Sequence, residues 1–203
     1  MLAKRLLLRQ PIPGASGAPT IPIDAVIRRS HAPQSVFIPL NIALLTVSDS
    51  RTLASDTSGN YLAQVLQAAG HRLADRQIEI DDRYRLRAIV SRWIATAEID
   101  GIVLTGGTGF TGRDSTPEAI QPLLDKEMPG FGEIFRALSL ADIGTSALQS
   151  RAFAGLANGV FVFCLPGSTG ACKLAWEQIL SQQLDARTQP CNLVALKPRL
   201  HEH

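Results

Sequence analysis

Residues 105–114 read TGGTGFTGRD and directly follow the short apolar run IVL at residues 102–104. Four of the sixteen glycines of the chain fall within seven residues of this stretch. An apolar run that leads into glycines and then into Ser115, Thr116 and Pro117 is typical of a strand, a tight loop and the start of a helix. Because glycine lacks a Cβ atom, the backbone N–H groups of such a loop can approach an anion closely. The stretch therefore predicts a strand–loop–helix unit that binds a phosphate-bearing ligand.

Two familiar phosphate-binding loops match this stretch in part. Three of its glycines give the spacing G-x-G-x-x-G, but the dinucleotide loop follows the first strand of its unit and precedes an acidic residue roughly 20 residues on. Here at least two strands come earlier, and the residues near position 128 are typical of helix and turn. Residues 107–112 also have Walker A spacing, but Arg113 and Asp114 stand where that loop needs Lys and Ser or Thr. We therefore favour neither loop.

The acidic residue at position 114 indicates a different role. A carboxylate beside a phosphate-binding loop repels the ligand unless a cation lies between them, so Asp114 is a candidate Mg²⁺ ligand. The alternative is that Asp114 caps the helix that begins near Pro117. The residues alone leave both interpretations open.

Composition limits the class of protein. The length of 203 residues and the hydrophobic content of 45% fit one ordinary globular domain. Residues 1–35 carry five basic side chains and one acidic side chain, so the remainder, with fifteen and seventeen, is near neutral. This balance argues against a nucleic-acid-binding surface. The three cysteines show no paired metal-ligand spacing and suit a reducing compartment, so we expect a cytoplasmic protein.

Residues 1–35 differ from the rest of the chain. They hold five of the twelve prolines and show no lasting periodicity, which predicts a disordered or arm-like leader. The LLL run at residues 6–8 is too short to span a membrane, and we expect no membrane association. Organelle targeting is an alternative, although the prolines between residues 11 and 22 disfavour the amphipathic helix that it needs.

Apolar segments at residues 40–47, 71–80, 100–104 and 160–165 predict strands. The first is almost continuously apolar, as expected of a strand that is buried on both faces of a parallel sheet. Amphipathic stretches at residues 57–69 and 83–97 predict connecting helices and hence parallel pairing with right-handed crossovers. Because ligands bind outside the carboxyl ends of such strands, Ser48, Asp81 and the glycine loop should share one edge. Alternatively, Asp81 and Asp82 form a turn or a helix cap.

The later part of the chain adds a second small-residue loop. Residues 117–124 predict a short helix, residues 128–133 (MPGFGE) a sharp turn, and residues 134–140 the start of another helix. Residues 166–170 (PGSTG) follow the fourth strand and open a helix over residues 171–180, whose N-terminus can hold an anion. Residues 186–203 predict a polar tail that lies over the domain or over a neighbouring subunit.

Several motifs around the glycine loop occur together in one known family. They are TVSDSR at 46–51, DTSG at 56–59, TPEA at 116–119, MPGFGE at 128–133, LQSR at 148–151 and LPGST at 165–169. In this order and spacing they resemble the MoaB/MogA family of molybdenum cofactor biosynthesis proteins, and the LDARTQPCN segment at 184–192 is more similar to the MoaB branch. The resemblance implies a three-layer α/β/α domain with a mostly parallel central sheet over residues 36–185.

The resemblance implies a Mg²⁺-dependent nucleotidyltransferase that adenylylates molybdopterin. A terminal phosphate of the pterin attacks the α-phosphate of ATP, which gives adenylyl-molybdopterin and pyrophosphate. Such chemistry needs charge neutralisation and in-line placement of two anions more than it needs a protein base. The alternative is a non-catalytic molybdopterin-binding or carrier protein of the same pathway.

The resemblance also implies roles for particular residues. Asp81 and Asp114 match the acids that bind Mg²⁺ and support catalysis, with Asp82 as the alternative to Asp81. Substrate contacts are implied for Gly106, Gly107, Thr108, Gly109, Ser150, Arg151, Pro166, Gly167 and Ser168. Nucleotide contacts are implied for Ser48, Asp56, Ser58 and Gly59.

Members of this family form trimers, and MoaB-like members pair two trimers into hexamers. The resemblance therefore implies a homotrimer or hexamer, which hands its product over to a molybdate-inserting protein. Phe131, Phe135 and Leu138 are candidate contacts for that assembly, and their burial within the subunit is the alternative.

Overall fold

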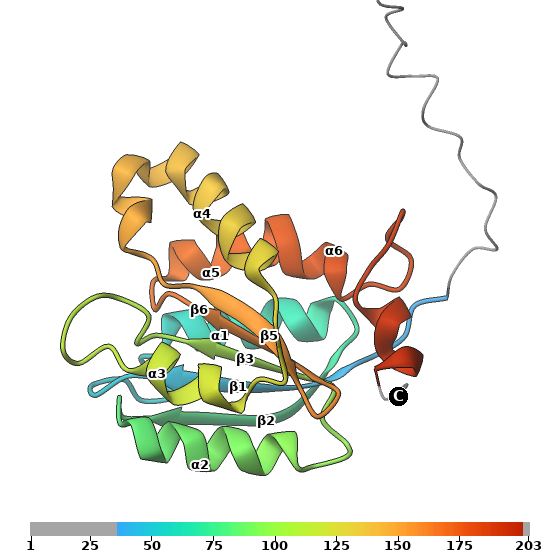
Figure 1. Ribbon diagram of the computed structural model, residues 1–203, viewed down its shortest axis with the longest axis horizontal. Helices are drawn as coiled ribbons and strands as arrows, with labels where there is room; N and C mark the ends of the chain where they lie inside the picture. Colours follow the sequence, from blue (N-terminus) through green and yellow to red (C-terminus); the bar gives the residue numbers. More distant parts are fainter. Residues whose placement is uncertain (1–35, 201–203) are drawn as a thin grey trace, which may run out of the picture. The chain divides into compact units, whose positions relative to one another are not determined.

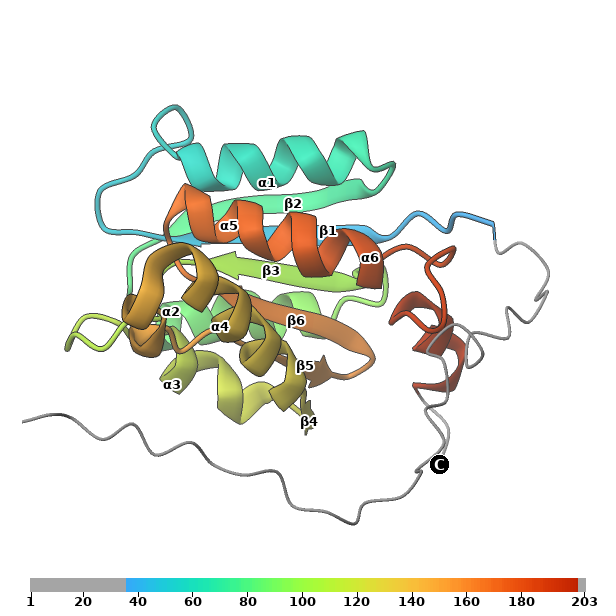
Figure 2. The same ribbon diagram turned by 90° about the horizontal axis from the view of Figure 1, so that it is seen from above.

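The computed structural model describes residues 36–200, and the predicted leader lies outside the described residues. One sheet with helices on both of its faces makes up the described part of the chain (Figures 1 and 2). The predicted three-layer α/β/α architecture is therefore confirmed.

Within residues 36–200, the sheet has six strands in the order β2-β1-β3-β6-β5-β4. Their bounds are Asn41–Val47 (β1), Arg72–Glu79 (β2), Gly101–Thr105 (β3), Lys126–Glu127 (β4), Phe153–Ala157 (β5) and Val160–Leu165 (β6). Strands β2, β1, β3 and β6 run parallel, whereas β5 and β4 pair antiparallel with their neighbours. The mostly parallel sheet is thus confirmed, and the carboxyl ends of β1, β3 and β6 lie next to one another.

Helices cover both faces of this sheet. Their bounds are Thr57–Ala68 (α1), Arg83–Ile94 (α2), Thr116–Ile120 (α3), Pro129–Ile143 (α4), Thr169–Ala175 (α5) and Ser181–Gln183 (α6). A π-helical segment, Trp176–Leu180, joins α5 to α6, so residues 169–183 form one helical run. Short 3-10 helices occur at Gln121–Leu123, Gly144–Gln149 and Val194–Arg199.

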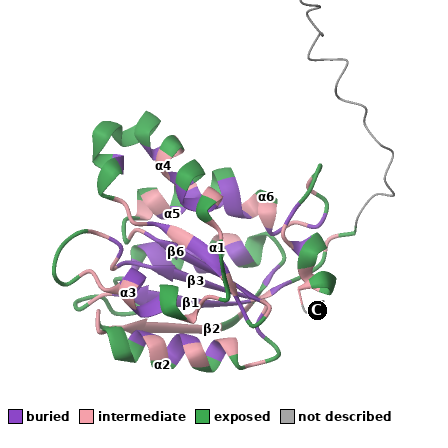
Figure 3. Cartoon of the chain, in the orientation of Figure 1, coloured by how far each residue is buried: buried purple, intermediate pink, exposed green. Residues whose placement is uncertain are grey.

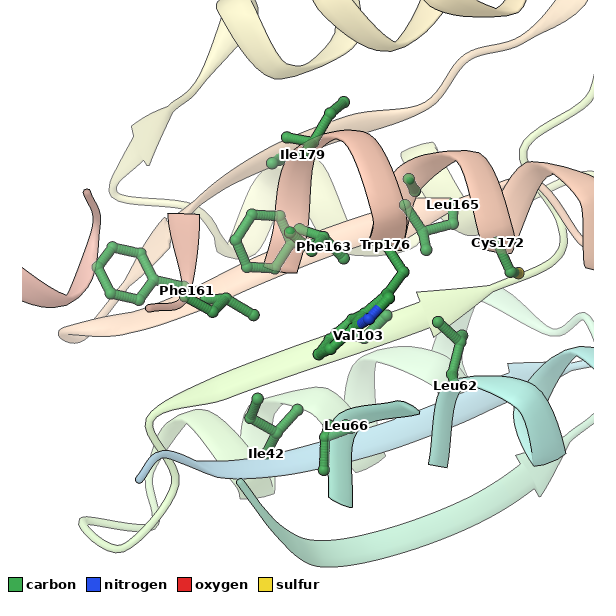
Figure 4. Packing of buried hydrophobic residues seen from close by; sticks show 14 of the residues in the cluster. Ile42, Leu62, Leu66, Val103, Phe161, Phe163, Leu165, Cys172, Trp176 and Ile179 are labelled. Carbon is green, nitrogen blue, oxygen red and sulfur yellow. The ribbon is translucent and has the colours of Figure 1, made fainter. Parts of the chain in front are cut away.

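Side chains alternate along the strands and so divide the core into two clusters. In β1, Ile42 and Leu44 pack on the side of α1, α4 and α5, whereas Ala43 and Leu45 pack on the side of α2 and α3. Figure 4 shows the first cluster, in which Leu66 of α1 lies close to Ile42. Because both faces are covered, β1 is almost continuously apolar, as predicted. Each fully buried large apolar side chain contributes about 1.5–3 kcal/mol to folding.

Aspartates begin the two helices that connect the first three strands. The Asp56 carboxylate accepts the Gly59 N–H at 2.9 Å, and the Asp82 carboxylate accepts two N–H groups of the first turn of α2 at 3.0 Å. Such caps satisfy backbone donors that have no partner inside the helix. Gly70, just beyond α1, has a φ of 96°, which suits a helix stop. The predicted start and stop of α1 are confirmed.

The sharp turn expected at residues 128–133 is wrong, because these residues open α4 at Pro129. Proline is favourable at the first helical position, where its missing N–H needs no partner. Gly132 serves close packing here, since a Cβ atom on it would lie 2.7 Å from the carbonyl oxygen of Ala152. Gly132 therefore lets α4 approach the start of β5 closely.

Phe131 and Phe135 are buried within the subunit, with 3% and 1% of their surface exposed, and Leu138 packs against the same cluster. Burial within the subunit, the alternative to an assembly contact, is therefore confirmed for the two phenylalanines, whereas Leu138 is partly buried. The outer side of α4 is exposed (Figure 3) and carries Ile134 and Leu140.

The segment after α6 packs back onto the domain. The backbone N–H of Leu193 donates to the carbonyl of Gln183 at 3.0 Å, Val194 is buried in the core, and Lys197 forms an ion pair with Asp100. None of the helices within residues 36–200 has the length and apolar character needed to cross a membrane.

Candidate functional site

A cavity of about 540 Å³ opens at the carboxyl ends of β1, β3 and β6. Its walls come from the loops after these strands on one side and from α4 and the following turn on the other. The predicted site residues that line it are Ser48, Asp56, Ser58, Gly106, Gly107, Thr108, Gly109, Asp114, Ser150, Pro166, Gly167 and Ser168. Asp81, Gly59 and Arg151 lie outside the lining. The structure thus brings most of these residues to one edge of the sheet.

The glycine loop follows a path that side chains would block. Gly106 has a φ of 108°, and a Cβ atom on it would lie 2.2 Å from the carbonyl oxygen of Val47. Gly107 has a φ of 64°, and a Cβ atom there would lie 2.4 Å from Oγ1 of Thr116. Thr116 also fixes the loop, because its hydroxyl donates to the Gly106 carbonyl at 2.9 Å and its N–H to the Gly107 carbonyl at 3.0 Å. The loop therefore has a defined shape with a bare backbone.

The loop at residues 166–168 lies directly beside the glycine loop. A Cβ atom on Gly167 would lie 3.3 Å from Cα of Gly106. The hydroxyl of Ser58 donates to the Gly167 carbonyl at 2.9 Å, which ties this loop to the start of α1. Ser168 caps the next helical run by accepting the N–H of Ala171 at 3.2 Å. Two glycine-containing loops, each followed by a helix, thus form adjacent parts of one cavity.

Asp81 and Asp82 are neighbours in the chain but have different contacts. Asp82 caps α2, whereas Oδ1 of Asp81 accepts the N–H of Ser115 at 3.1 Å and the Ser115 hydroxyl at 2.5 Å. Oδ2 of Asp81 lies 2.5 Å from the position that a Cβ atom on Gly107 would take. Of the two acids, Asp81 is therefore the one that contacts the glycine loop.

Asp114 contacts the glycine loop from within it. Its Oδ2 atom accepts the hydroxyl of Thr111 at 2.6 Å and the Thr111 N–H at 2.8 Å. The helix-cap interpretation is wrong, because the residue that precedes α3 is Ser115. Partial burial raises the pKa of Asp114, but hydrogen bonds from Thr111 and the nearby Arg151 outweigh it, so the pKa lies below its ordinary value. Asp114 is consequently a carboxylate at neutral pH.

Arg151 supports the loop from behind. Its Nε donates to the Gly109 carbonyl at 2.7 Å, its Nη2 to the Asp114 carbonyl at 2.9 Å, and its Nη1 pairs with Glu118 at 2.5 Å. Its own backbone N–H donates to the Thr108 carbonyl at 3.0 Å. The planar guanidinium suits this set of contacts, which holds the loop backbone in place. The structure therefore favours a positioning role for Arg151 over the predicted substrate contact.

Asp56 ties α1 to the sheet at the floor of the cavity. It is 1% exposed and accepts hydrogen bonds from the Thr46 hydroxyl at 2.7 Å and from Arg76 at 2.9 Å, besides the cap to Gly59. Burial raises the pKa of Asp56, but the bonds from Gly59, Thr46 and Arg76 outweigh it and hold the pKa below its ordinary value. A Cβ atom on Gly59 would lie 2.0 Å from Oδ2 of Asp56, so the cap needs this glycine.

The wall opposite the glycine loop consists of residues that sequence reasoning missed. Phe135, Ser139 and Asp142 line the cavity from α4, and Gln149 lines it from the following 3-10 helix. Their spacing in α4, at i, i+4 and i+7, places the first three on one face of the helix. Ser139 is buried, and its hydroxyl donates to the Phe135 carbonyl at 2.8 Å. No signal in the sequence assigns these residues to a site, because the assignment needs the position of α4.

Asp81 and Asp114 carry oxygen donors of the kind that Mg²⁺ prefers. Within the described residues there is no group of three or more His, Cys, Asp or Glu side chains that could hold a metal alone. Mg²⁺ at nucleotide sites commonly takes one or two carboxylates and completes its shell with phosphate oxygens and water. The two carboxylates lie against Gly107 and Gly109, where an added Cβ atom would meet them at 2.5 and 2.8 Å. Hard oxygen donors therefore adjoin the predicted phosphate-binding backbone.

Comparison with known proteins identifies the class to which this fold and site belong. Residues 43–186 match the family model described as "Probable molybdopterin binding domain". The chain is 55% identical over 156 residues to molybdenum cofactor biosynthesis protein B of Escherichia coli (strain K12). This alignment covers 77% of this chain and 92% of that relative.

Solved structures agree. One crystal structure of molybdenum cofactor biosynthesis protein B has a TM-score of 0.75 and 36% identity, and covers 83% of this chain and 100% of that chain. The tungsten cofactor synthesizing protein MoaB from Pyrococcus furiosus has a TM-score of 0.64 and 36% identity, and covers 71% and 92%. The chain therefore belongs to the molybdopterin-binding domain family. Within it, the chain belongs to the MoaB branch of the molybdenum cofactor biosynthesis proteins.

Proposed function

We propose that this protein acts in molybdenum cofactor biosynthesis by adenylylating molybdopterin with ATP in a Mg²⁺-dependent reaction. The observation that carries the proposal is the single cavity where the glycine loop, Asp114 and the loop at residues 166–168 meet. The family match supports molybdopterin as the ligand, and the name of the Escherichia coli relative supports a role in molybdenum cofactor biosynthesis. A cavity of about 540 Å³ also has the size of a small-molecule site.

The residues in and beside the cavity supply what the transfer needs. The backbone of residues 106–109 binds the phosphate groups of one substrate, and the loop at residues 166–168 holds the pterin beside it. Asp81 and Asp114 would hold Mg²⁺, which neutralises phosphate charge when it is bound. No protein base is needed, because a phosphate oxygen is already anionic near neutral pH. The loops thus place the attacking phosphate in line with the α-phosphate of ATP.

A non-catalytic molybdopterin-binding role is the second candidate. The observation that favours it is the position of Asp81, which lies outside the cavity lining while Asp114 lies within it. Calorimetry at saturating Mg²⁺ separates the two candidates, since binding of the pterin with no binding of ATP or AMP would support the carrier.

The direct test of the enzyme is pyrophosphate release from ATP in the presence of molybdopterin and Mg²⁺. We expect release by the wild-type chain and none by Asp114→Asn, with the fold retained in both. Asp125→Asn is a matched control, because the Asp125 carboxylate accepts the backbone N–H of Asn158 and lies outside the cavity lining. Full activity of Asp114→Asn would remove the metal-binding role from this residue.

We also propose a homotrimer or a hexamer of paired trimers in the cytoplasm, which passes its product to a molybdate-inserting protein. The exposed apolar side chains on and after α4 support an assembly surface, since Ile134, Leu140 and Ile143 are 54–55% exposed and Leu148 is 78% exposed. Sedimentation equilibrium tests the assembly, and a monomer at micromolar concentration would contradict it.

A further inference from the structure

One carboxylate bridges the three loops that carry the proposed metal site. Asp49 follows β1, and its Oδ1 atom accepts the backbone N–H of Asp81 at 3.1 Å. Its Oδ2 atom accepts a hydrogen bond from Nε–H of Arg113 at 3.1 Å and also forms an ion pair with Nη2 of that arginine. Arg113 directly precedes Asp114 in the glycine loop. Asp49 therefore connects the segment that carries Asp81 to the segment that carries Asp114, although it lies outside the cavity lining.

The contribution of this ion pair to folding is small. The side chains of Arg113 and Asp49 are 66% and 49% exposed, and solvent screens such a pair so that it stabilises the fold little. The pair instead constrains geometry. Asp81 is held at its N–H by Asp49 and at Oδ1 by Ser115, while its Oδ2 atom has no hydrogen bond within residues 36–200 and faces the glycine loop.

We propose that Asp49 is a positioning residue for the metal site, which orients Asp81 through its N–H and Asp114 through Arg113. This inference rests on the proposed function, since it takes Asp81 and Asp114 as the Mg²⁺ ligands. Partners that orient metal-binding carboxylates typically change metal affinity about 10–100-fold when they are removed. A residue of that kind changes metal binding far more than it changes stability.

Three substitutions separate the contacts. Asp49→Asn keeps an oxygen acceptor for the Asp81 N–H but loses the anionic partner of Arg113, whereas Asp49→Ala loses both contacts. Arg113→Gln removes the ion pair from its other side. Arg187→Gln is the matched control, because Arg187 is 57% exposed and pairs with the single aspartate Asp185 outside the cavity lining.

The experiment is a Mn²⁺ titration of the full chain, followed by electron paramagnetic resonance, with a non-hydrolysable ATP analogue present. We expect Asp49→Ala to weaken Mn²⁺ binding about 10–100-fold and the two milder variants to weaken it less. The thermal unfolding midpoint of each variant should stay within the range set by Arg187→Gln. The double variant Asp49→Asn/Arg113→Gln should bind Mn²⁺ as well as the weaker of its two parents, because both changes remove the same ion pair.

Several results would overturn the positioning role. If Asp49→Ala binds Mn²⁺ with wild-type affinity, Asp49 has no positioning role, and the proposed transferase activity still stands. Fully multiplicative losses in the double variant also remove it, because Arg113 would then contact the ligand independently of Asp49. A wild-type chain that binds Mn²⁺ but releases no pyrophosphate would contradict the transferase activity alone, while a wild-type chain that binds no Mn²⁺ would overturn both.

Discussion

The carboxylate of Asp81 lies against the backbone of Gly107, with its Oδ2 atom 2.5 Å from the position that a Cβ atom on this glycine would take. The acid comes from the segment after β2 and the glycine from the segment after β3, so their contact joins the loops of two strands that lie on either side of β1. At this separation there is no room for a methyl group. The φ of 64° at Gly107 adds backbone strain for any other residue.

We therefore expect Gly107→Ala to displace Asp81 and to abolish pyrophosphate release, with a loss of stability of about 1–3 kcal/mol from backbone strain. Gly112→Ala in the same loop is the control, because nothing lies within 4 Å of its added Cβ atom. Pyrophosphate release and urea unfolding of both variants make the test. A wild-type rate in Gly107→Ala would show that the contact has no role.

The pair Asp81 and Asp82 allows a comparison of two adjacent acids. Asp81→Asn should lower the rate on the order of 100-fold, because it removes a charge beside the phosphate-binding loop. Asp82→Asn removes the same charge one residue away but keeps the helix cap, since asparagine caps as well as aspartate, so its rate should stay near wild type. Steady-state rates at saturating Mg²⁺ distinguish the two, and equal losses would reassign the second acid.

Removal of the Asp56 carboxylate should destabilise the fold strongly. Asp56→Ala leaves Arg76, whose side chain is 17% exposed, without its partner, and loss of one member of a buried pair typically costs about 3–5 kcal/mol. Urea unfolding measures this change. Asp49→Ala is the control that should change little, because the side chains of Asp49 and its partner Arg113 are 49% and 66% exposed. A similar loss in both variants would contradict the special position of Asp56.

The same carboxylate predicts the behaviour of the fold in acid. The pKa of Asp56 is lower in the folded chain than its ordinary value of 3.8, so its contribution is complete above about that pH. The contribution is lost as the pH falls through the lower folded pKa. Asp56→Asn should flatten this part of the stability profile, and an unchanged profile would assign the acid sensitivity to other groups.

His71 predicts a second pH dependence. Its Nδ1 atom accepts the N–H of Leu40 at 3.2 Å, and burial lowers its pKa below the ordinary value of 6.5, against the charges of Asp185 and Asp100. The stability that neutral His71 provides is therefore complete above pH 6.5 and is lost as the pH falls through the lower folded pKa.

Urea unfolding across this pH range tests the role of His71, which is the only histidine within residues 36–200. His71→Gln keeps an acceptor for the Leu40 N–H but does not titrate, so its stability should vary less with pH. A variant whose stability still falls below pH 6.5 as steeply as that of wild type would exclude His71 as the cause.

Local sequence signals are sufficient to predict the parallel strands of the sheet. The apolar runs of β1, β3 and β6 are buried on both faces, and each run ends at a cluster of small or polar residues that forms part of the site edge. These features are properties of short segments, so composition and spacing reveal them. The glycine loop is also visible in the sequence, because the positive φ angles at Gly106 and Gly107 require glycine at these positions.

The antiparallel edge and the α4 wall depend on contacts that are distant in sequence. The segment FAGLA of β5 contains a glycine at position 155 and two alanines, and β4 is only two residues long, so neither has the pattern of a strand. The two glycines of residues 128–133 are typical of a turn, whereas in the structure Gly132 lets α4 pack closely against the residue before β5. Ser139 and Asp142 could not be assigned to the cavity without the position of α4, and the separate contacts of Asp81 and Asp82 needed coordinates.

The approach of α4 to β5 at Gly132 has a consequence for engineering. A Cβ atom there would lie 2.7 Å from the carbonyl oxygen of Ala152, the residue before β5, so a larger residue would push the helix and the strand apart. The same helix carries Phe135 and Ser139 to the cavity. A methyl group at position 132 would therefore shift this wall, although Gly132 itself does not line the cavity. Gly132 is thus a position at which the size of the cavity can be altered while the residues that line it stay unmutated.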